Sequence, residues 1–128
     1  MATRSRIGIL NDDMTVESIY CHYDGYISRN GELLHRLWSE HEKLISLLAG
    51  GDISSLGEDM DDTTFYFRDR RETGCESIVH PLNSWPTCDQ NFEYLYNPKL
   101  GAWSARQVVG DGECNSKPWV SLAEALKT

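Results

Sequence analysis

The first part of the chain alternates apolar and polar residues with a period of two, which predicts a strand over residues 4–10. Successive side chains of a strand point to opposite faces. One face therefore carries the isoleucines of this segment, and the other face carries Arg4 and Arg6. Residues 16–23 are rich in β-branched and aromatic side chains, which favours a second strand. The Asn-Asp-Asp-Met turn between the two segments predicts an antiparallel hairpin.

Leucines that recur at helical spacings predict one long helix over residues 31–49, because such spacings place apolar side chains on one stripe. Asn30 or Ser28 is expected to cap the start of this helix. Gly50 and Gly51 are expected to end it, since glycine readily adopts the left-handed conformation. The apolar stripe consists of Leu33, Leu34, Leu37, His41, Leu44, Ile45 and Leu48.

Further strands and a short helix are expected in the rest of the chain. The aromatic segment 63–67 predicts a strand. The segment 73–90 is expected to be irregular, with a short strand at 77–80 as one possibility. Residues 91–96 and 102–109 predict a hairpin, because their link contains a proline and a glycine. Residues 120–126 predict a short amphipathic helix. The expected fold class is α+β: a mainly antiparallel sheet of about five strands, one long helix packed on one face, and a short C-terminal helix.

The composition predicts a single domain over residues 1–128, since a chain of this length can bury one hydrophobic core. Hydrophobic residues make up 40% and charged residues 25%, which argues against disorder of the body of the chain. The sequence contains neither a run of about 18 apolar residues nor a secretory signal, so we expect no membrane association. The cysteines lack the C-x-x-C spacing of zinc sites and are expected to be reduced. No metal and no cofactor is expected.

The charge balance bears on the class of partner. The net charge is −8, from 20 acidic and 12 basic side chains, which disfavours nonspecific binding to nucleic acid. A cluster of carboxylates could either solubilise the chain or imitate phosphates toward a basic partner, because opposite potentials steer association. This acidic loop consists of Glu58, Asp59, Asp61 and Asp62.

Arginines and aromatic residues suggest a second kind of site, for a nucleotide ligand. Guanidinium groups bind phosphates bidentately, and aromatic rings stack on bases. Such a site, either in one chain or in a homodimer interface, requires the first, third and last predicted strands to be neighbours. Otherwise the arginines are expected to pair with the surplus carboxylates. The candidate residues are Arg4, Arg6, Tyr23, Arg68, Arg70 and Arg106.

The segment from Cys21 to Asp24 places a thiol, an imidazole and a carboxylate close together in sequence. A cysteine nucleophile needs a base within hydrogen-bond reach. Cys21 and His22 are adjacent on a predicted strand and should therefore point to opposite faces. We expect Cys21 to be buried and His22 to face outward, so no catalytic residue is assigned. A small enzyme that uses a Cys/His site is kept as the least favoured alternative.

Four stretches together resemble a family of small proteins encoded by tailed bacteriophages and prophages. They are Thr3–Ile9, Ser18–Tyr26, Gly51–Gly57 and Arg68–Arg70, in the same order along the chain. The family carries no established activity that could be transferred. This chain departs from it at Met14, where relatives have glycine, at Tyr23, where many have tryptophan, and at Arg71, where many have glycine.

The resemblance implies a phage protein that acts in the host cytoplasm. Together with the acidic charge and the lack of a catalytic motif, it predicts an inhibitor that binds a host protein of an antiviral defence system, of the anti-CRISPR or anti-restriction type. In this hypothesis the acidic loop contacts the host defence protein. The alternative is a sponge that sequesters a host nucleotide signalling molecule through the arginines.

Overall fold

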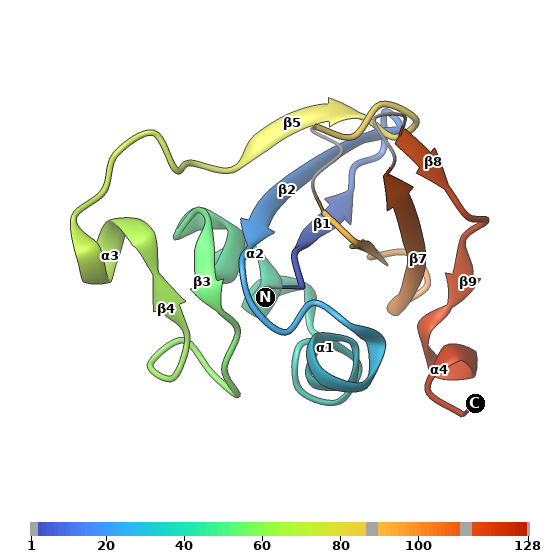
Figure 1. Ribbon diagram of the computed structural model, residues 1–128, viewed down its shortest axis with the longest axis horizontal. Helices are drawn as coiled ribbons and strands as arrows, with labels where there is room; N and C mark the ends of the chain where they lie inside the picture. Colours follow the sequence, from blue (N-terminus) through green and yellow to red (C-terminus); the bar gives the residue numbers. More distant parts are fainter. Residues whose placement is uncertain (1–2, 87–89, 111–113, 128) are drawn as a thin grey trace.

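The computed structural model describes residues 3–86, 90–110 and 114–127, and its strands form a mixed sheet (Figure 1). The strands are β1 (Ser5–Leu10), β2 (Thr15–Cys21), β3 (Ile53–Ser55), β4 (Thr64–Phe65), β5 (Ile78–Pro81), β6 (Phe92–Asn97), β7 (Ala102–Gly110), β8 (Cys114–Ser116) and β9 (Val120–Ser121). Their order is β4-β3-β2-β1-β6-β7-β8, while β5 pairs with β2 and β9 pairs with β7. Figure 1 shows β4 and β8 at opposite ends of the molecule.

The helices are short. They are the π-helix η1 (Ile27–Gly31), which continues directly into α1 (Glu32–Leu37), then α2 (His41–Ala49), α3 (Tyr66–Arg70) and α4 (Leu122–Ala125). Leucines of α1 and α2 join isoleucines of β1 and β2 and aromatic residues of β6 and β7 in one buried core. This core covers one face of the central strands, and we call the opposite face the outer face. No helix in the described ranges combines the length and the apolar content that a bilayer crossing requires.

The sheet corrects the predicted fold class. An antiparallel sheet with one long helix on its face is wrong, because β1 pairs in parallel with β6 and β2 pairs in parallel with β3. Parallel pairing needs a crossover, and the chain makes one of these crossovers with η1, α1 and α2 between β2 and β3. The hairpin formed by β1 and β2 and the hairpin formed by β6 and β7 are antiparallel and confirm those two predictions.

The predicted helix over 31–49 is also wrong, because the chain leaves the helical conformation at Trp38. The indole of Trp38 is fully buried and donates a hydrogen bond from Nε1 to the Gly57 carbonyl at 3.0 Å. The break rotates the second half of the predicted stripe, so that His41 and Ile45 are exposed. Leu47, which lies outside the predicted stripe, is buried instead.

The predicted cap at the start of the helical segment is wrong, and the predicted end at the glycine pair is confirmed. Neither Ser28 nor Asn30 caps α1, since no side chain caps this helix and the Asn30 amide donates to the Tyr23 carbonyl. α2 ends as expected at the glycine pair, where Gly51 has a φ of +82°.

The strand predicted over 63–67 is only partly formed, since β4 ends at Phe65 and α3 begins at Tyr66. The Asp69 carboxylate accepts a hydrogen bond from the Phe65 amide at 2.8 Å, which satisfies a backbone donor at the start of the helix. The helix predicted over 120–126 is likewise shorter, because its first residues form β9.

Candidate functional site

The outer face of the sheet carries a row of polar residues across its centre. The strand register places Tyr20 of β2 opposite Arg6 of β1, Arg6 beside Glu93 of β6, and Glu93 opposite Arg106 of β7. Arg6 is only 6% exposed and Glu93 only 2%. Charged side chains are seldom buried unless they are paired, so this row is the first candidate for a functional site.

Glu93 is held by partners on both of its carboxylate oxygens. Arg106 donates from Nε to Oε1 at 2.6 Å, and Gln90 donates from Nε2 to Oε2 at 2.7 Å. Glu93 also acts on the guanidinium of Arg6, where burial lowers the pKa while Asp52 and Glu93 raise it. One buried carboxylate is therefore shared between two arginines.

Arg6 connects this pair to a buried serine and histidine. Its Nε donates to Ser18 Oγ at 3.0 Å, and its Nη2 donates to the Ser18 carbonyl at 3.2 Å. Ser18 Oγ lies 2.9 Å from Nε2 of His80, whose Nδ1 lies 2.9 Å from the Pro81 carbonyl. Because a carbonyl only accepts, Nδ1 carries the proton, and the serine hydroxyl donates to Nε2. Burial lowers the pKa of His80, so the neutral ring is favoured.

Two tryptophans enclose the far end of the row. The Arg106 guanidinium carbon lies 4.3 Å from the Trp119 ring centre and 5.9 Å from that of Trp85, and the two indoles are 5.7 Å apart. Within the described part of the chain, the Nη groups of Arg106 make no hydrogen bond. Beside them lies a cavity of about 220 Å³, which we call the Trp85 pocket, lined by Asn83, Ser84, Trp85, Glu93, Arg106, Val108 and Ser116.

The opposite end of the row carries a second group, the Arg–Tyr cluster, which consists of Arg4, Tyr20, His22, Tyr23, Tyr66 and Arg70. Arg4 lies close enough to Tyr20 to lower the pKa of its phenol, and the Tyr20 hydroxyl lies 2.7 Å from His22 Nδ1. The guanidinium of Arg70 lies 5.3 Å from the ring centre of Tyr66. Burial raises the pKa of Tyr20; Arg4 lowers it and Tyr66 raises it, so both ends of the cluster act on this phenol.

The structure separates the residues that the sequence assigned to one nucleotide site. Arg4 and Arg70 belong to the Arg–Tyr cluster, Arg4 beside Tyr20 and Arg70 beside Tyr66, and Tyr23 joins it through an edge-to-face contact with His22 at 4.6 Å. Arg6 and Arg106 lie on the same face, but both are engaged with the buried Glu93 network. A single site would need the first, third and last predicted strands to be neighbours in the sheet. They are not, because β4 is separated from β1 by β3 and β2. The condition that the sequence set for a single shared site is therefore not met.

Arg68 instead hydrogen-bonds to the backbone in and beside the acidic loop. Its Nη1 donates to the Met60 carbonyl at 2.8 Å, its Nη2 donates to the Thr63 carbonyl at 2.7 Å, and the side chain pairs with Asp69. The alternative expectation, that arginines pair with this chain's carboxylates, is thus confirmed for Arg68 and for Arg106.

Two of the four carboxylates of the acidic loop, Asp59 and Asp62, accept hydrogen bonds from backbone amides of the loop itself. The Asp62 carboxylate accepts from the Glu58 amide at 3.1 Å, and the Asp59 carboxylate accepts from the Asp62 amide at 2.9 Å. Glu58 and Asp61 are exposed, and their carboxylates make no hydrogen bond or ion pair within the described residues. The loop is therefore a fixed turn that presents these two carboxylates to solvent.

Cys21 is not placed for catalysis. Its side chain is fully buried, and burial raises the pKa of the thiol to about 11. His22 lies on the other side of the strand with the Arg–Tyr cluster, which confirms the expected opposite orientation. A thiolate is therefore disfavoured at neutral pH.

Sequence reasoning missed the side chains that complete the outer face. Glu93 and Tyr20 alternate with core residues on their strands, and this pattern could have placed them on the outer face. His80, Trp85 and Trp119 gave no such signal, because they reach the face through β5 and two irregular segments. Among the residues that the structure describes, no group of His, Cys, Asp or Glu side chains is arranged to hold a metal ion.

Comparison with known proteins adds no relative. No family model matches the chain, and neither a curated protein nor a solved structure matches it significantly.

Proposed function

We propose that the protein binds an anionic, nucleotide-type small molecule on the outer face of its sheet and acts as a sponge for a host signalling nucleotide. The observation that carries this proposal is Arg106, whose Nε donates to Glu93 while its guanidinium lies 4.3 Å and 5.9 Å from the centres of two indole rings. A guanidinium held in this way loses little freedom when its Nη groups bind a phosphate. The adjoining Trp85 pocket provides polar side chains beside these donors.

The Arg–Tyr cluster supports the same class of ligand. Arg4 and Arg70 each contact a tyrosine, which combines phosphate donors with rings on which a base can stack. Three of the stretches that resemble phage proteins supply every residue of this cluster except Tyr66. A phage origin is consistent with a sponge that works in the host cytoplasm, and it remains part of the proposal.

The test is thermal unfolding in the presence of a panel of linear and cyclic nucleotides. A ligand that binds only the folded state at 100 times its Kd should raise the Tm by about 10 °C for a chain of this size. In Arg106→Lys the charge beside Glu93 is kept but the forked donor is lost, so the shift should shrink while the fold persists. Arg36→Lys is the matched control, since Arg36 is exposed and, among the described residues, its ion pair is with Glu32.

Two results would contradict the sponge. The first is a Tm that no nucleotide raises at concentrations far above micromolar. The second is a shift that survives in Arg106→Lys and also in an Arg4→Gln, Arg70→Gln double variant, because the ligand would then bind elsewhere.

The second candidate function is inhibition of a host defence protein through the acidic loop. The observation that favours it is the internal bonding of the loop, because a preorganised surface loses less entropy on binding. Glu58 and Asp61 then imitate phosphates toward a basic channel on the host protein.

Glu58→Lys with Asp61→Lys tests the second candidate without removing the bonds of Asp59 and Asp62. Defence inhibition in infected cells should be lost, whereas the Tm should not fall. Asp12→Lys with Glu124→Lys changes the net charge equally on surfaces far from the loop in sequence. Equal inhibition by both double variants and the unaltered protein would reject the acidic-loop contact.

A further inference from the structure

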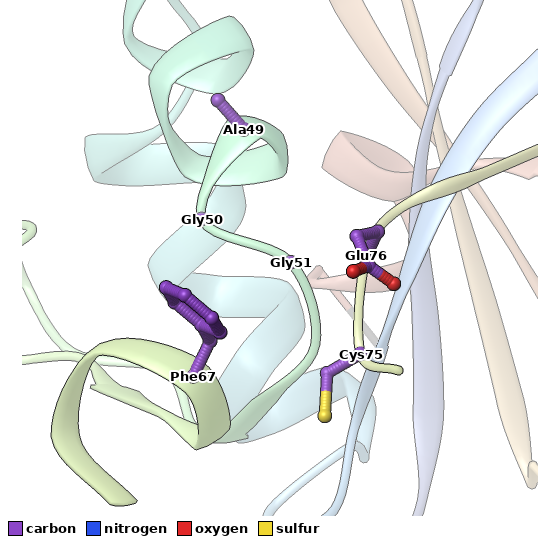
Figure 2. Close-up of a pocket in the computed structure, with 6 residues that line it drawn as sticks. All are labelled: Ala49, Gly50, Gly51, Phe67, Cys75 and Glu76. Carbon is purple, nitrogen blue, oxygen red and sulfur yellow. The ribbon is translucent and has the colours of Figure 1, made fainter. Parts of the chain in front are cut away.

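A second cavity lies on a different part of the surface, where the end of α2 meets α3 and the segment before β5 (Figure 2). We call it the Gly50 pocket; it has a volume of about 160 Å³ and is lined by Ala49, Gly50, Gly51, Phe67, Cys75 and Glu76. Figure 2 shows the Phe67 ring on one side of this space and the Cys75 and Glu76 side chains on the other. The pocket contains none of the residues of the outer-face site or of the acidic loop.

The two glycines fix one part of the Gly50 pocket by close packing. A Cβ on Gly51 would lie 2.4 Å from the Cys75 carbonyl, and a Cβ on Gly50 would lie 2.4 Å from the Phe65 ring. These close approaches join the end of α2 to β4 and to the segment around Cys75, where the Asp52 amide donates to the Cys75 carbonyl at 2.7 Å. The part of the pocket around the two glycines is therefore built by the fold, while the exposed Phe67 ring supplies the apolar wall.

The pocket combines an apolar wall with negative charge at its mouth. Phe67 is 59% exposed, which is unusual for a large aromatic side chain. Glu76 is exposed across the pocket from it, and the charged groups that act on the Cys75 thiol are the carboxylates of Asp52, Glu72 and Glu76. Burial and these carboxylates raise the pKa of this thiol. Apolar contact with nearby negative charge suits a side chain that has a hydrocarbon stem and a cationic head.

We propose that the Gly50 pocket receives a lysine side chain of a partner protein, with the methylene stem against Phe67 and the ammonium group at Glu76. Arginine fits less well, because its hydrocarbon stem is one methylene shorter than that of lysine. A nucleotide is disfavoured by the carboxylates. The inference goes beyond ligand binding on the outer face, and it gives the protein a binding point for basic partners that is independent of Glu58 and Asp61.

Cys75 offers a direct probe of the potential in the pocket. Methanethiosulfonates that carry an aminoethyl cation or a sulfonatoethyl anion transfer that group with its sulfur to the thiolate: a disulfide bond forms, the sulfur–sulfonyl bond breaks, and methanesulfinate leaves. Both reagents need the thiolate, so the ratio of their rates cancels the effect of the pKa. The rates at Cys75 are followed by mass spectrometry of its peptide and compared with the ratio for a short neutral cysteine peptide.

The cation should react ~3- to 10-fold faster, relative to the anion, than it does with the reference peptide, because of the nearby carboxylates. Glu76→Gln should bring this ratio part of the way back to the reference, since Asp52 and Glu72 also act on the thiol. A ratio equal to that of the reference in the unaltered protein would overturn the proposal.

A second experiment tests whether the hydrocarbon stem of lysine binds the pocket, by asking whether a lysine analogue protects Cys75 from labelling. N-acetyl-lysine amide at about 20 mM should slow the labelling, since a ligand of this size binds in the millimolar range, whereas N-acetyl-norleucine amide should not. Phe67→Ala should abolish the protection but keep the charge ratio. Equal protection by both amides, or protection that persists in Phe67→Ala, would reject a lysine site, and so would no protection at all. None of these readouts depends on nucleotide binding.

Discussion

At the scale of single residues, Glu93 has the largest structural consequence on the outer face. It is buried, it accepts from Arg106 and Gln90, and it acts on the guanidinium of Arg6. Removing one partner of a buried ion pair leaves an uncompensated charge, which costs more than the intact pair contributes. The residue that holds Arg106 for a ligand is thus also a determinant of stability.

We therefore predict that Glu93→Gln lowers the free energy of unfolding by roughly 3 kcal/mol, as measured by urea denaturation. Arg106→Met combined with Glu93→Gln should recover part of this loss, since the double variant removes one of the unpaired charges. Glu124→Gln is the control; Glu124 forms an exposed ion pair with Lys127, so its removal should change stability very little. A Glu93→Gln protein as stable as the unaltered one would show that the carboxylate is dispensable.

His80 should make stability depend on pH in a defined direction. Burial lowers its pKa below the usual 6.5, with Arg6 acting in the same direction and Glu93 opposing it. The unfolded state therefore binds a proton more readily than the folded state does. The contribution is fully present above pH 6.5 and is lost as the pH falls from 6.5 toward the lowered pKa of the folded state.

His80→Asn should flatten this part of the pH profile, because asparagine can hydrogen-bond to Ser18 but does not titrate. The measurement is the free energy of unfolding between pH 7.5 and pH 5 for both proteins. An unchanged slope in His80→Asn would mean that other groups produce the pH dependence.

At the scale of elements, the connection after α2 depends on Gly51. Its φ is +82°, and a Cβ would also lie 2.4 Å from the Cys75 carbonyl. Gly74 has a similar φ of +77°, but nothing lies within 4 Å of its Cβ position. Gly51→Ala should therefore destabilise the protein by about 2–3 kcal/mol, and Gly74→Ala by about 1 kcal/mol. Urea titrations of both variants separate backbone strain from the steric contact; equal losses would contradict this explanation.

The elements also show which parts of the fold could be predicted. Both hairpins follow from alternation and turn residues, since all the necessary information is local. The break at Trp38 could not be predicted from spacing, because the leucine pattern continues across it. What interrupts the helix is a distant contact, the hydrogen bond from the Trp38 indole to Gly57. The parallel pairing of β1 with β6 likewise joins segments that are far apart in sequence.

At the scale of the whole molecule, the candidate site also depends on contacts between segments that are far apart in sequence, which the sequence pattern does not predict. The sequence predicts that Arg4 and Arg6 share a face, and they do. It gives no means of placing Arg68 and Arg106 relative to them, because that depends on the strand order. The sequence indicates which segment carries each arginine. The residues that surround it depend on the strand order, which the crossovers of the sheet determine.

The net charge of −8 leads to the last prediction. Several carboxylates, including Glu58 and Asp61, are exposed without an internal partner in the described residues, so self-repulsion should lower the stability of the folded state. Raising NaCl should screen this repulsion and increase the Tm by a few degrees, while buried pairs such as Glu93–Arg106 are screened much less. Glu58→Lys with Asp61→Lys adds four positive units and halves the net charge, so its Tm should be higher at low salt and respond less to NaCl. A Tm that falls with added NaCl would instead show that attractive surface pairs outweigh the repulsion of the surplus carboxylates.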